Sequence, residues 1–111
     1  AYGAQVEMHH YEPLFKDMRQ DKRLLALFKD VMTEFGETPR ILPDDEADGS
    51  TDVGNVSYEV PTAQPTLQIG LGLEAHTPEF TCAAGSDYGL AQAIKGAKIM
   101  AVVALRYAMC K

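Results

Sequence analysis

A short polar loop and a single histidine near the middle of the chain are the residues whose types and spacing could do chemistry. The loop reads Gly-Ser-Thr-Asp-Val-Gly-Asn-Val-Ser over residues 49–57, and His76 follows in the stretch Glu-Ala-His-Thr-Pro-Glu-Phe. Glycines allow a tight turn with exposed amide hydrogens, and the hydroxyl and carboxyl side chains can bond to nearby backbone. Asp52 can therefore cap a short helix or orient a group beside a metal, and these two roles are compatible.

The other polar side chains offer less chemistry. A neutral imidazole can bind zinc, but a zinc site needs three or four protein ligands, and a lone loop histidine such as His76 is more often a surface residue. His9 and His10 are adjacent, so on a strand they would point to opposite faces and could not hold one ion together. The serines have no His-Asp partners in a nucleophile setting, and Cys82 is expected to be a buried structural thiol.

The loop resembles a segment of a known enzyme family. The co-catalytic zinc metallopeptidases include aminoacylases, hippurate hydrolases and glutamate-releasing carboxypeptidases, and their aminobenzoyl-glutamate hydrolase branch carries Gly-Ser-Thr-Asp-Val-Gly-Asp-Val-Ser. Asn55 stands where that segment has its second Asp. Residues 76–80, His-Thr-Pro-Glu-Phe, are similar to the setting of the family's last metal ligand. The likeness covers most of residues 40–108, although relatives tend to carry a His before the Lys-Gly pair, where this chain has Ile94.

This resemblance implies a metal-dependent amidohydrolase or metallopeptidase. Its substrate would be an acyl-amino acid, aminobenzoyl-glutamate or a dipeptide-like molecule, cleaved at an amide bond by a water held between two ions of zinc, or of manganese or cobalt. The resemblance places His76 among the metal ligands and Gly49, Ser50, Thr51 and Asp52 along the substrate pocket. It assigns no catalytic residue to this chain, because the family's other metal motifs belong to the amino-terminal half of its catalytic domain.

The resemblance also divides the chain near its start. Residues 1–11 would be the final strand of the family's lid, or dimerisation, domain, and residues 12–111 the carboxy-terminal portion of its catalytic domain. We therefore expect a fragment that is inactive by itself and that forms a homo-oligomer through an uncovered sheet edge and apolar face. The alternative is a stand-alone acidic α/β module that binds or oligomerises without catalysis, with the acidic run 44–48 facing a cation or a basic partner.

Composition limits the choice of partners. Hydrophobic residues make up 46% of the 111 residues and charged residues 23%, which is the balance of a globular protein. The formal net charge of -6, with no basic stripe, argues against a nucleic-acid partner. The 2 cysteines are too few for a disulfide framework or a cysteine-based zinc site. No apolar run suggests a membrane span and the start resembles no secretory signal, so we expect no membrane partner and a cytoplasmic location.

The spacing of apolar residues predicts alternating strands and helices. Residues 2–11 and 66–73 alternate as half-buried strands do, and residues 40–43 form a very short strand. Apolar residues recur at helical spacing between a cap at Asp21 and a stop at Gly36, and a long helix rich in small residues occupies 87–109. This order predicts an α/β fold class, as a partial three-layer α/β/α sheet domain of the zinc-peptidase type. In such a sheet the polar loop and His76 lie together at the carboxyl ends of strands.

Overall fold

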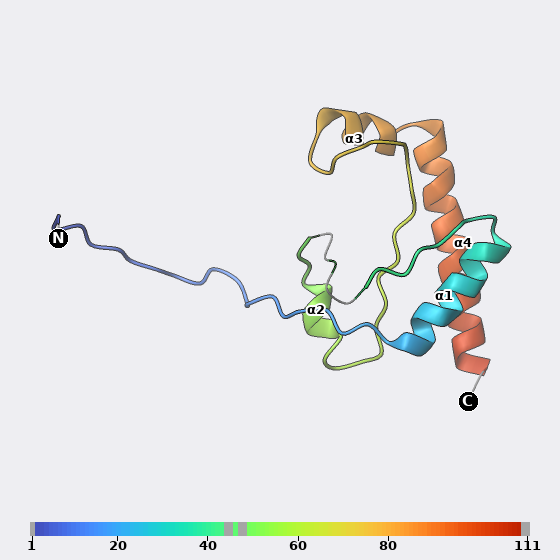
Figure 1. Cartoon of the computed structure of the whole chain (residues 1–111), viewed down its shortest axis with the longest axis horizontal. Helices are drawn as coiled ribbons and strands as arrows, with labels where there is room; N and C mark the ends of the chain where they lie inside the picture. Colours follow the sequence, from blue (N-terminus) through green and yellow to red (C-terminus); the bar gives the residue numbers. More distant parts are fainter. Residues whose placement is uncertain (1, 44–45, 47–48, 110–111) are drawn as a thin grey trace.

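The computed structural model describes residues 2–43, 46 and 49–109. Its helices, in chain order, are α1 (Lys22–Glu34), α2 (Val53–Val56), α3 (Pro78–Ala84) and α4 (Asp87–Met109). Figure 1 shows α1 crossing α4, α3 at the start of α4, and the amino-terminal residues extending away from the helices. Extended chain and turns connect the helices, and none of the described residues lies in a β-strand.

The prediction of an α/β sheet domain is therefore wrong for the described residues, which are helical without any sheet. A strand is stable only when a neighbouring strand pairs with its backbone, and alternation of apolar residues does not show that such a neighbour exists. Residues 2–11 run away from the rest of the chain (Figure 1). Residues 66–73 pass beside α4 instead, where the Gln68 carbonyl accepts a hydrogen bond of 3.0 Å from the Gln92 side chain. Residues 40–43 are also extended without a ladder.

The predicted limits of α1 are confirmed. The Asp21 carboxylate accepts a hydrogen bond of 2.8 Å from the amide of Leu24, which satisfies one of the free amides of the first turn. Gly36 ends the helix region with φ of 81°, a left-handed conformation that glycine adopts at little cost.

The helix α3 is absent from the sequence prediction, although its start carries recognisable signals. Thr77 has extended backbone and its hydroxyl accepts a hydrogen bond of 3.2 Å from the amide of Phe80. Pro78 occupies the first turn, where its fixed φ suits a helix, and Glu79 complements the positive helix end. These residues form a standard helix start, directly after the alternating residues 66–73 that favour a strand.

The core is small and lies between α1 and α4. It consists of Val31, Met32, Ile99 and Val103, each at most 6% exposed. The partly buried apolar side chains that pack around it are Leu24, Leu27, Phe28, Phe35, Leu67 and Val102. The long helix predicted over 87–109 is confirmed, and its first turn is capped by the Ser86 hydroxyl, which accepts a hydrogen bond of 3.0 Å from the amide of Gly89.

Two ion pairs lie beside this core and connect the carboxyl end of α1 to α4. The Arg106 guanidinium donates to both carboxylate oxygens of Glu34, at 2.6 and 2.8 Å. The Lys95 ammonium donates to Glu37, which lies just beyond α1 and is also within reach of the buried Gln92 side chain. The hydrogen bond from Arg106 holds the pKa of Glu34 below the ordinary value of 4.5, and the hydrogen bond from Lys95 does the same for Glu37. Both pairs therefore favour α1–α4 packing when the carboxylates are ionised.

The face of α4 opposite the core is uncovered in the described part of the chain. Exposed apolar residues recur every three or four positions along this face: Leu90, Ile94, Ala97, Ala101, Leu105 and Ala108. The helix is also long and apolar enough to cross a membrane, in contrast to the sequence expectation that no run has that length. Length and composition alone do not separate a membrane span from a core helix, and α4 carries core side chains on its other face.

Candidate functional site

The polar loop, residues 49–52, leads directly into α2. The Thr51 hydroxyl accepts a hydrogen bond of 3.3 Å from the amide of Val53, and the Thr51 carbonyl accepts one of 3.3 Å from the amide of Gly54. Asp52 occupies the cap position of α2, but its side chain makes no capping hydrogen bond. The capping role considered for the Asp52 carboxylate is therefore not observed, because the neighbouring Thr51 supplies the acceptor.

The second half of the motif holds another part of the chain. The Asn55 side-chain oxygen accepts a hydrogen bond of 2.7 Å from the amide of Lys16, and its side-chain nitrogen donates one of 3.2 Å to the carbonyl of Leu14. The Ser57 hydroxyl accepts a hydrogen bond of 2.9 Å from the amide of Arg19. These bonds fasten residues 14–19, which we call the strap, against α2.

Gly54 is the closest point of approach between the strap and α2. It is buried, and a Cβ atom added to it would lie 2.1 Å from the Lys16 carbonyl oxygen and 3.3 Å from that of Asp17. Glycine is therefore required here for close backbone contact. The motif alone predicts a substrate loop and gives no sign of the strap, since Lys16 lies 39 residues away from Asn55 in the chain.

A charged cluster covers the outer side of the strap. The Tyr58 ring has the Arg19 guanidinium 3.9 Å and the Lys16 ammonium 4.6 Å from its centroid, and the Tyr58 hydroxyl donates a hydrogen bond to the Asp17 carboxylate. This hydrogen bond lowers the pKa of Asp17 below 3.8 and raises the pKa of Tyr58 above 10.0. Every polar group of the cluster faces a group of this same chain, so the cluster strengthens the contact between the strap and the residues after α2.

His76 lies apart from this assembly in the turn that precedes α3. Its side chain is exposed and its φ is 66°, an uncommon value for a residue other than glycine. No hydrogen bond or ion pair joins His76 to residues 49–52, and α2 makes no contact with α3. The strand 66–73 that was expected to carry His76 toward the loop does not form, so the structure does not show the predicted convergence of the two.

No group of three or more histidine, cysteine, aspartate or glutamate side chains that could hold a metal occurs within residues 2–43, 46 and 49–109. The imidazole of His76 is one potential donor, and a zinc site needs several. Four residues of the acidic run 44–48 lie outside the described residues, as does Cys110. Cys82 is exposed, which corrects the expectation of a buried thiol, because it projects from the short helix α3 rather than from a sheet core.

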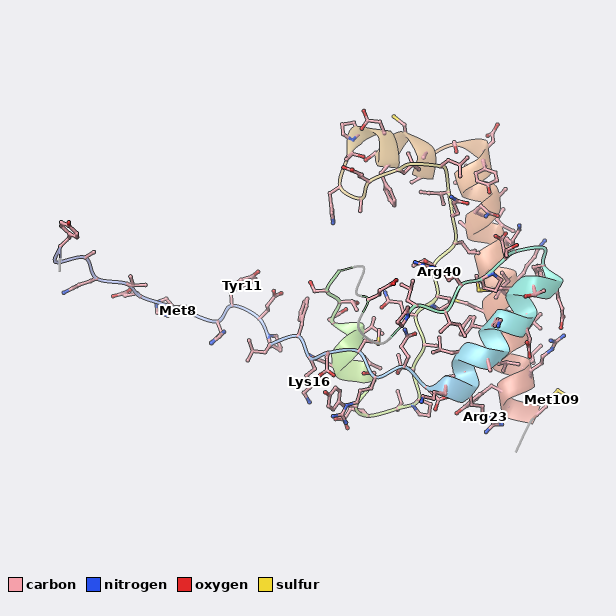
Figure 2. All side chains as sticks on the ribbon, viewed as in Figure 1. Met8, Tyr11, Lys16, Arg23, Arg40 and Met109 are labelled. Carbon is pink, nitrogen blue, oxygen red and sulfur yellow. The ribbon has the colours of Figure 1, made fainter. Side chains whose placement is uncertain are left out.

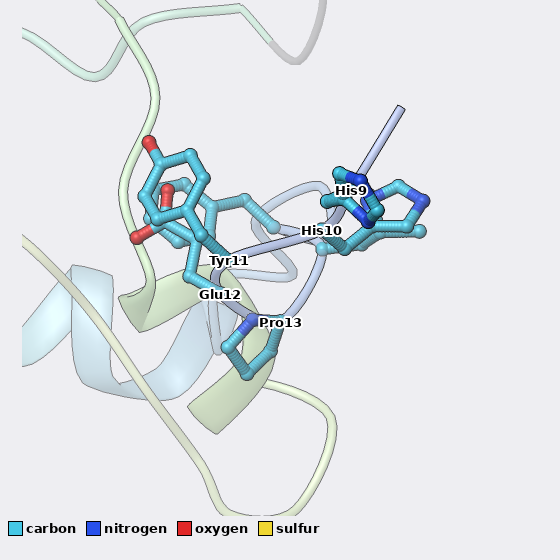
Figure 3. A pocket seen from close by; sticks show the side chains of 7 residues that line it. His9, His10, Tyr11, Glu12 and Pro13 are labelled. Carbon is cyan, nitrogen blue, oxygen red and sulfur yellow. The ribbon is translucent and has the colours of Figure 1, made fainter. Parts of the chain in front are cut away.

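Two open pockets occur elsewhere on the described surface. One is lined by residues 9–15 of the amino-terminal segment, and Figure 3 shows the side chains of His9, His10, Tyr11, Glu12 and Pro13 around it. Within that segment the His9 imidazole lies 3.6 Å from the Glu7 carboxylate. The other pocket is lined by Gln68, Gly70, Leu71 and Tyr88. Neither of these two pockets includes Asp52 or His76.

The comparisons with known proteins find local similarity to one enzyme. The chain is 44% identical over 57 residues to the Xaa-Arg dipeptidase of Mus musculus, and equally to that of Homo sapiens. The match covers 51% of this chain and 13% of each relative. No family model matches the chain, and no solved structure matches it. The chain therefore shares a peptidase-related segment with this dipeptidase, and the segment spans 13% of the dipeptidase's own length.

Proposed function

We propose that this chain is a carboxy-terminal part of the catalytic domain of a metal-dependent amidohydrolase related to dipeptidases. The observation that carries the proposal is the identity of 44% over 57 residues with the Xaa-Arg dipeptidases. The resemblance of residues 49–57 and 76–80 to the co-catalytic zinc metallopeptidases supports the same reaction class. The substrate would be a dipeptide or a related acyl-amino acid, and the name of the relatives makes a dipeptide that ends in arginine the first substrate to test.

The metal assigned to this enzyme class does not fit the described residues alone. They contain no cluster of ligands, and His76 could supply only one donor to a site completed by other parts of a larger protein. We therefore assign no catalytic step to this chain and expect it to be inactive by itself. Loop residues Gly49, Ser50, Thr51 and Asp52 would contact the substrate, and two ions of zinc, or of manganese or cobalt, would be bound in the complete enzyme.

The proposal is tested by replacing His76 in a full-length protein that contains this chain. His76→Ala should lower the bound metal content and the turnover of dipeptide substrates, because one metal ligand is lost, while thermal stability changes little since the side chain is exposed. His10→Ala is the matched control, because His10 is also exposed but lies outside residues 40–108, where the likeness to the metal and substrate segments is found. Full activity and full metal content in the His76 variant would contradict the assignment.

A second candidate function is a binding or oligomerisation module without catalysis. The observation that favours it is the uncovered apolar face of α4, defined above by residues 90–108, since surfaces of this kind commonly mark an interface. A homo-oligomer formed through this face is compatible with both candidates. Hydrolysis of a dipeptide by the full-length protein separates them, because a module without catalysis gives none at any metal concentration.

A further inference from the structure

The helix α2 connects two parts of the chain that have different surroundings. At its amino end, Thr51 of the loop 49–52 accepts hydrogen bonds from the first amides of the helix. On its side, Asn55 and Ser57 hold the strap, residues 14–19. Because α2 has 4 residues, the loop and the strap are fastened to the same single helical turn.

The strap and the loop are also the main attachments of this turn. α2 makes no contact with α1, α3 or α4 within the described chain. The strap, in contrast, leads directly into α1: the amide of Asp21 donates a hydrogen bond of 2.7 Å to the Thr62 carbonyl, and Asp21 then caps that helix. Gly54 rests on the Lys16 carbonyl with no room for a side chain between them. The position of α2 relative to the α1–α4 core is therefore set through the strap and through residues 57–62, which end at the Thr62 carbonyl that accepts from Asp21.

We infer that Asn55 couples the strap, which follows the amino-terminal arm of residues 2–13, to the loop 49–52. The arm continues directly into Leu14, whose carbonyl receives the Asn55 amide. Figure 2 shows Met8 and Tyr11 on the arm, away from the helices, and their exposed fractions of 84% and 91% agree with that placement. A displacement of the strap would carry α2 and the loop with it, because Asn55 and Ser57 bond to the strap. This inference goes beyond the proposed function, because it concerns how the loop is placed and not what the loop binds.

The geometry gives Asn55 a role that few side chains could fill. Its amide donates and accepts at the same time, so it pairs with the backbone of residues 14–16 as a neighbouring strand would. An aspartate keeps the acceptor for the Lys16 amide but loses the donor for the Leu14 carbonyl. An alanine loses both. Because the strap and the loop are bonded to the same helical turn, we expect a disturbance of one to change the stability of the other.

Amide hydrogen exchange, measured by NMR on the 111-residue chain, tests this coupling in both directions. Asn55→Ala should accelerate exchange at Lys16, which loses its acceptor, and also at Val53 and Gly54, whose acceptors in Thr51 are unchanged. Roughly fivefold acceleration is expected for the loss of a typical hydrogen bond. Alanine favours helix more than asparagine does, so its propensity would slow exchange in α2 and cannot produce the expected result.

The reverse experiment starts from the loop. Thr51→Val removes the hydroxyl acceptor of the Val53 amide without touching the strap, and it should accelerate exchange at Lys16 and Arg19. Glu59→Gln is the control for both experiments, because the Glu59 side chain is exposed and makes no hydrogen bond within the described residues. Exchange at Val103 in the core reports whether the fold persists.

Each outcome decides the inference. Faster amide exchange in both the strap and α2 in both variants, with exchange unchanged in Glu59→Gln, supports the inference. If Asn55→Ala changes Lys16 alone, or if Thr51→Val leaves Lys16 and Arg19 unchanged, the strap and the loop are independent and the inference is wrong. If Asn55→Ala unfolds the core, the Thr51→Val result alone decides. Because none of these measurements requires hydrolysis or metal, their failure is distinct from a failure of the proposed enzymatic function.

Discussion

Replacing Gly54 with alanine tests whether α2 is in close contact with the strap. The substitution should stabilise an isolated helix and destabilise a helix that packs against the strap. Gly54 lies in a helix and its φ is not positive, so in an isolated helix alanine would stabilise by about 0.5–1 kcal/mol. In this structure the added Cβ would lie 2.1 Å from the Lys16 carbonyl oxygen. Non-bonded carbon and oxygen atoms approach to roughly 3.3 Å at best, so the strap must retreat by about 1 Å.

The cost follows from the hydrogen bonds that this retreat stretches. The bond from Lys16 to Asn55 is 2.7 Å long, and a displacement of about 1 Å takes it beyond the useful range. The bonds between Asn55 and Leu14 and between Arg19 and Ser57 stretch with it. At about 1 kcal/mol each, the 3 bonds outweigh the gain in helix propensity. We expect Gly54→Ala to destabilise the contact between the strap and α2 by about 1 to 2 kcal/mol, since these bonds are partly exposed to water.

Local hydrogen exchange at Lys16, Arg19 and Ser57 measures this free energy without requiring the whole chain to unfold. Gly96→Ala is the matched control in α4, because its added Cβ would meet only the end of the Leu67 side chain, at 3.1 Å. That side chain can move, so helix propensity should dominate and the control should be neutral or stabilising. Slower exchange at Lys16 in Gly54→Ala would refute the close contact, and with it the assembly of the strap on α2.

Three further predictions concern α4. Since Lys95 depresses the folded-state pKa of Glu37, this ion pair stabilises the fold above about pH 4.5, and its contribution disappears as the pH falls through the lowered pKa. Thermal unfolding between pH 7 and pH 3 should show this loss of stability, and Glu37→Gln should make the unfolding temperature less dependent on pH. Gln92→Met should cost about 1 kcal/mol in urea unfolding because the buried side chain keeps its volume but no longer donates to backbone. Replacing Ile94 and Leu105 together with glutamine should abolish self-association measured by sedimentation, and a wild-type chain that stays monomeric at high concentration would contradict the oligomer proposal.

The helices could be predicted from the sequence because their signals are local. Asp21 and Gly36 mark the limits of α1 within a few residues of its apolar stripe, and both act as expected in the structure. The start of α3 at Thr77 and Pro78 carries signals of the same kind. The alternating residues before Thr77 favour a strand that would end near His76, and this pattern competes with the helix-start signals of α3.

The sheet could not be predicted reliably because a strand depends on residues distant in the chain. The alternation of residues 2–11 and 66–73 describes which side chains share a face, but no segment of the described chain pairs with either. The roles of Gly54 and Asn55 escaped prediction for the same reason. Their partners in the strap are set by the path of the chain, and an asparagine in a sequence does not indicate that it will bond to backbone 39 and 41 residues away.

The structure separates the motif residues that support the fold from those that are available for chemistry. Four residues of the motif each satisfy a backbone group or allow a backbone contact of this chain, namely Thr51, Gly54, Asn55 and Ser57. A structural role of these four residues does not by itself indicate a reaction, which has to be argued from the side chains that remain available.

Asp52 and His76 differ from these residues. The Asp52 carboxylate makes no capping bond, and the His76 imidazole has no hydrogen-bond partner among the described residues although its backbone holds an uncommon positive φ. Maintaining such a conformation costs about 1 kcal/mol or more, and a partnerless side chain gives no local compensation. In a larger protein, these two side chains are therefore the ones available to bind a metal or a substrate. A substitution of either should affect metal or substrate binding and leave the contact between the strap and α2 intact.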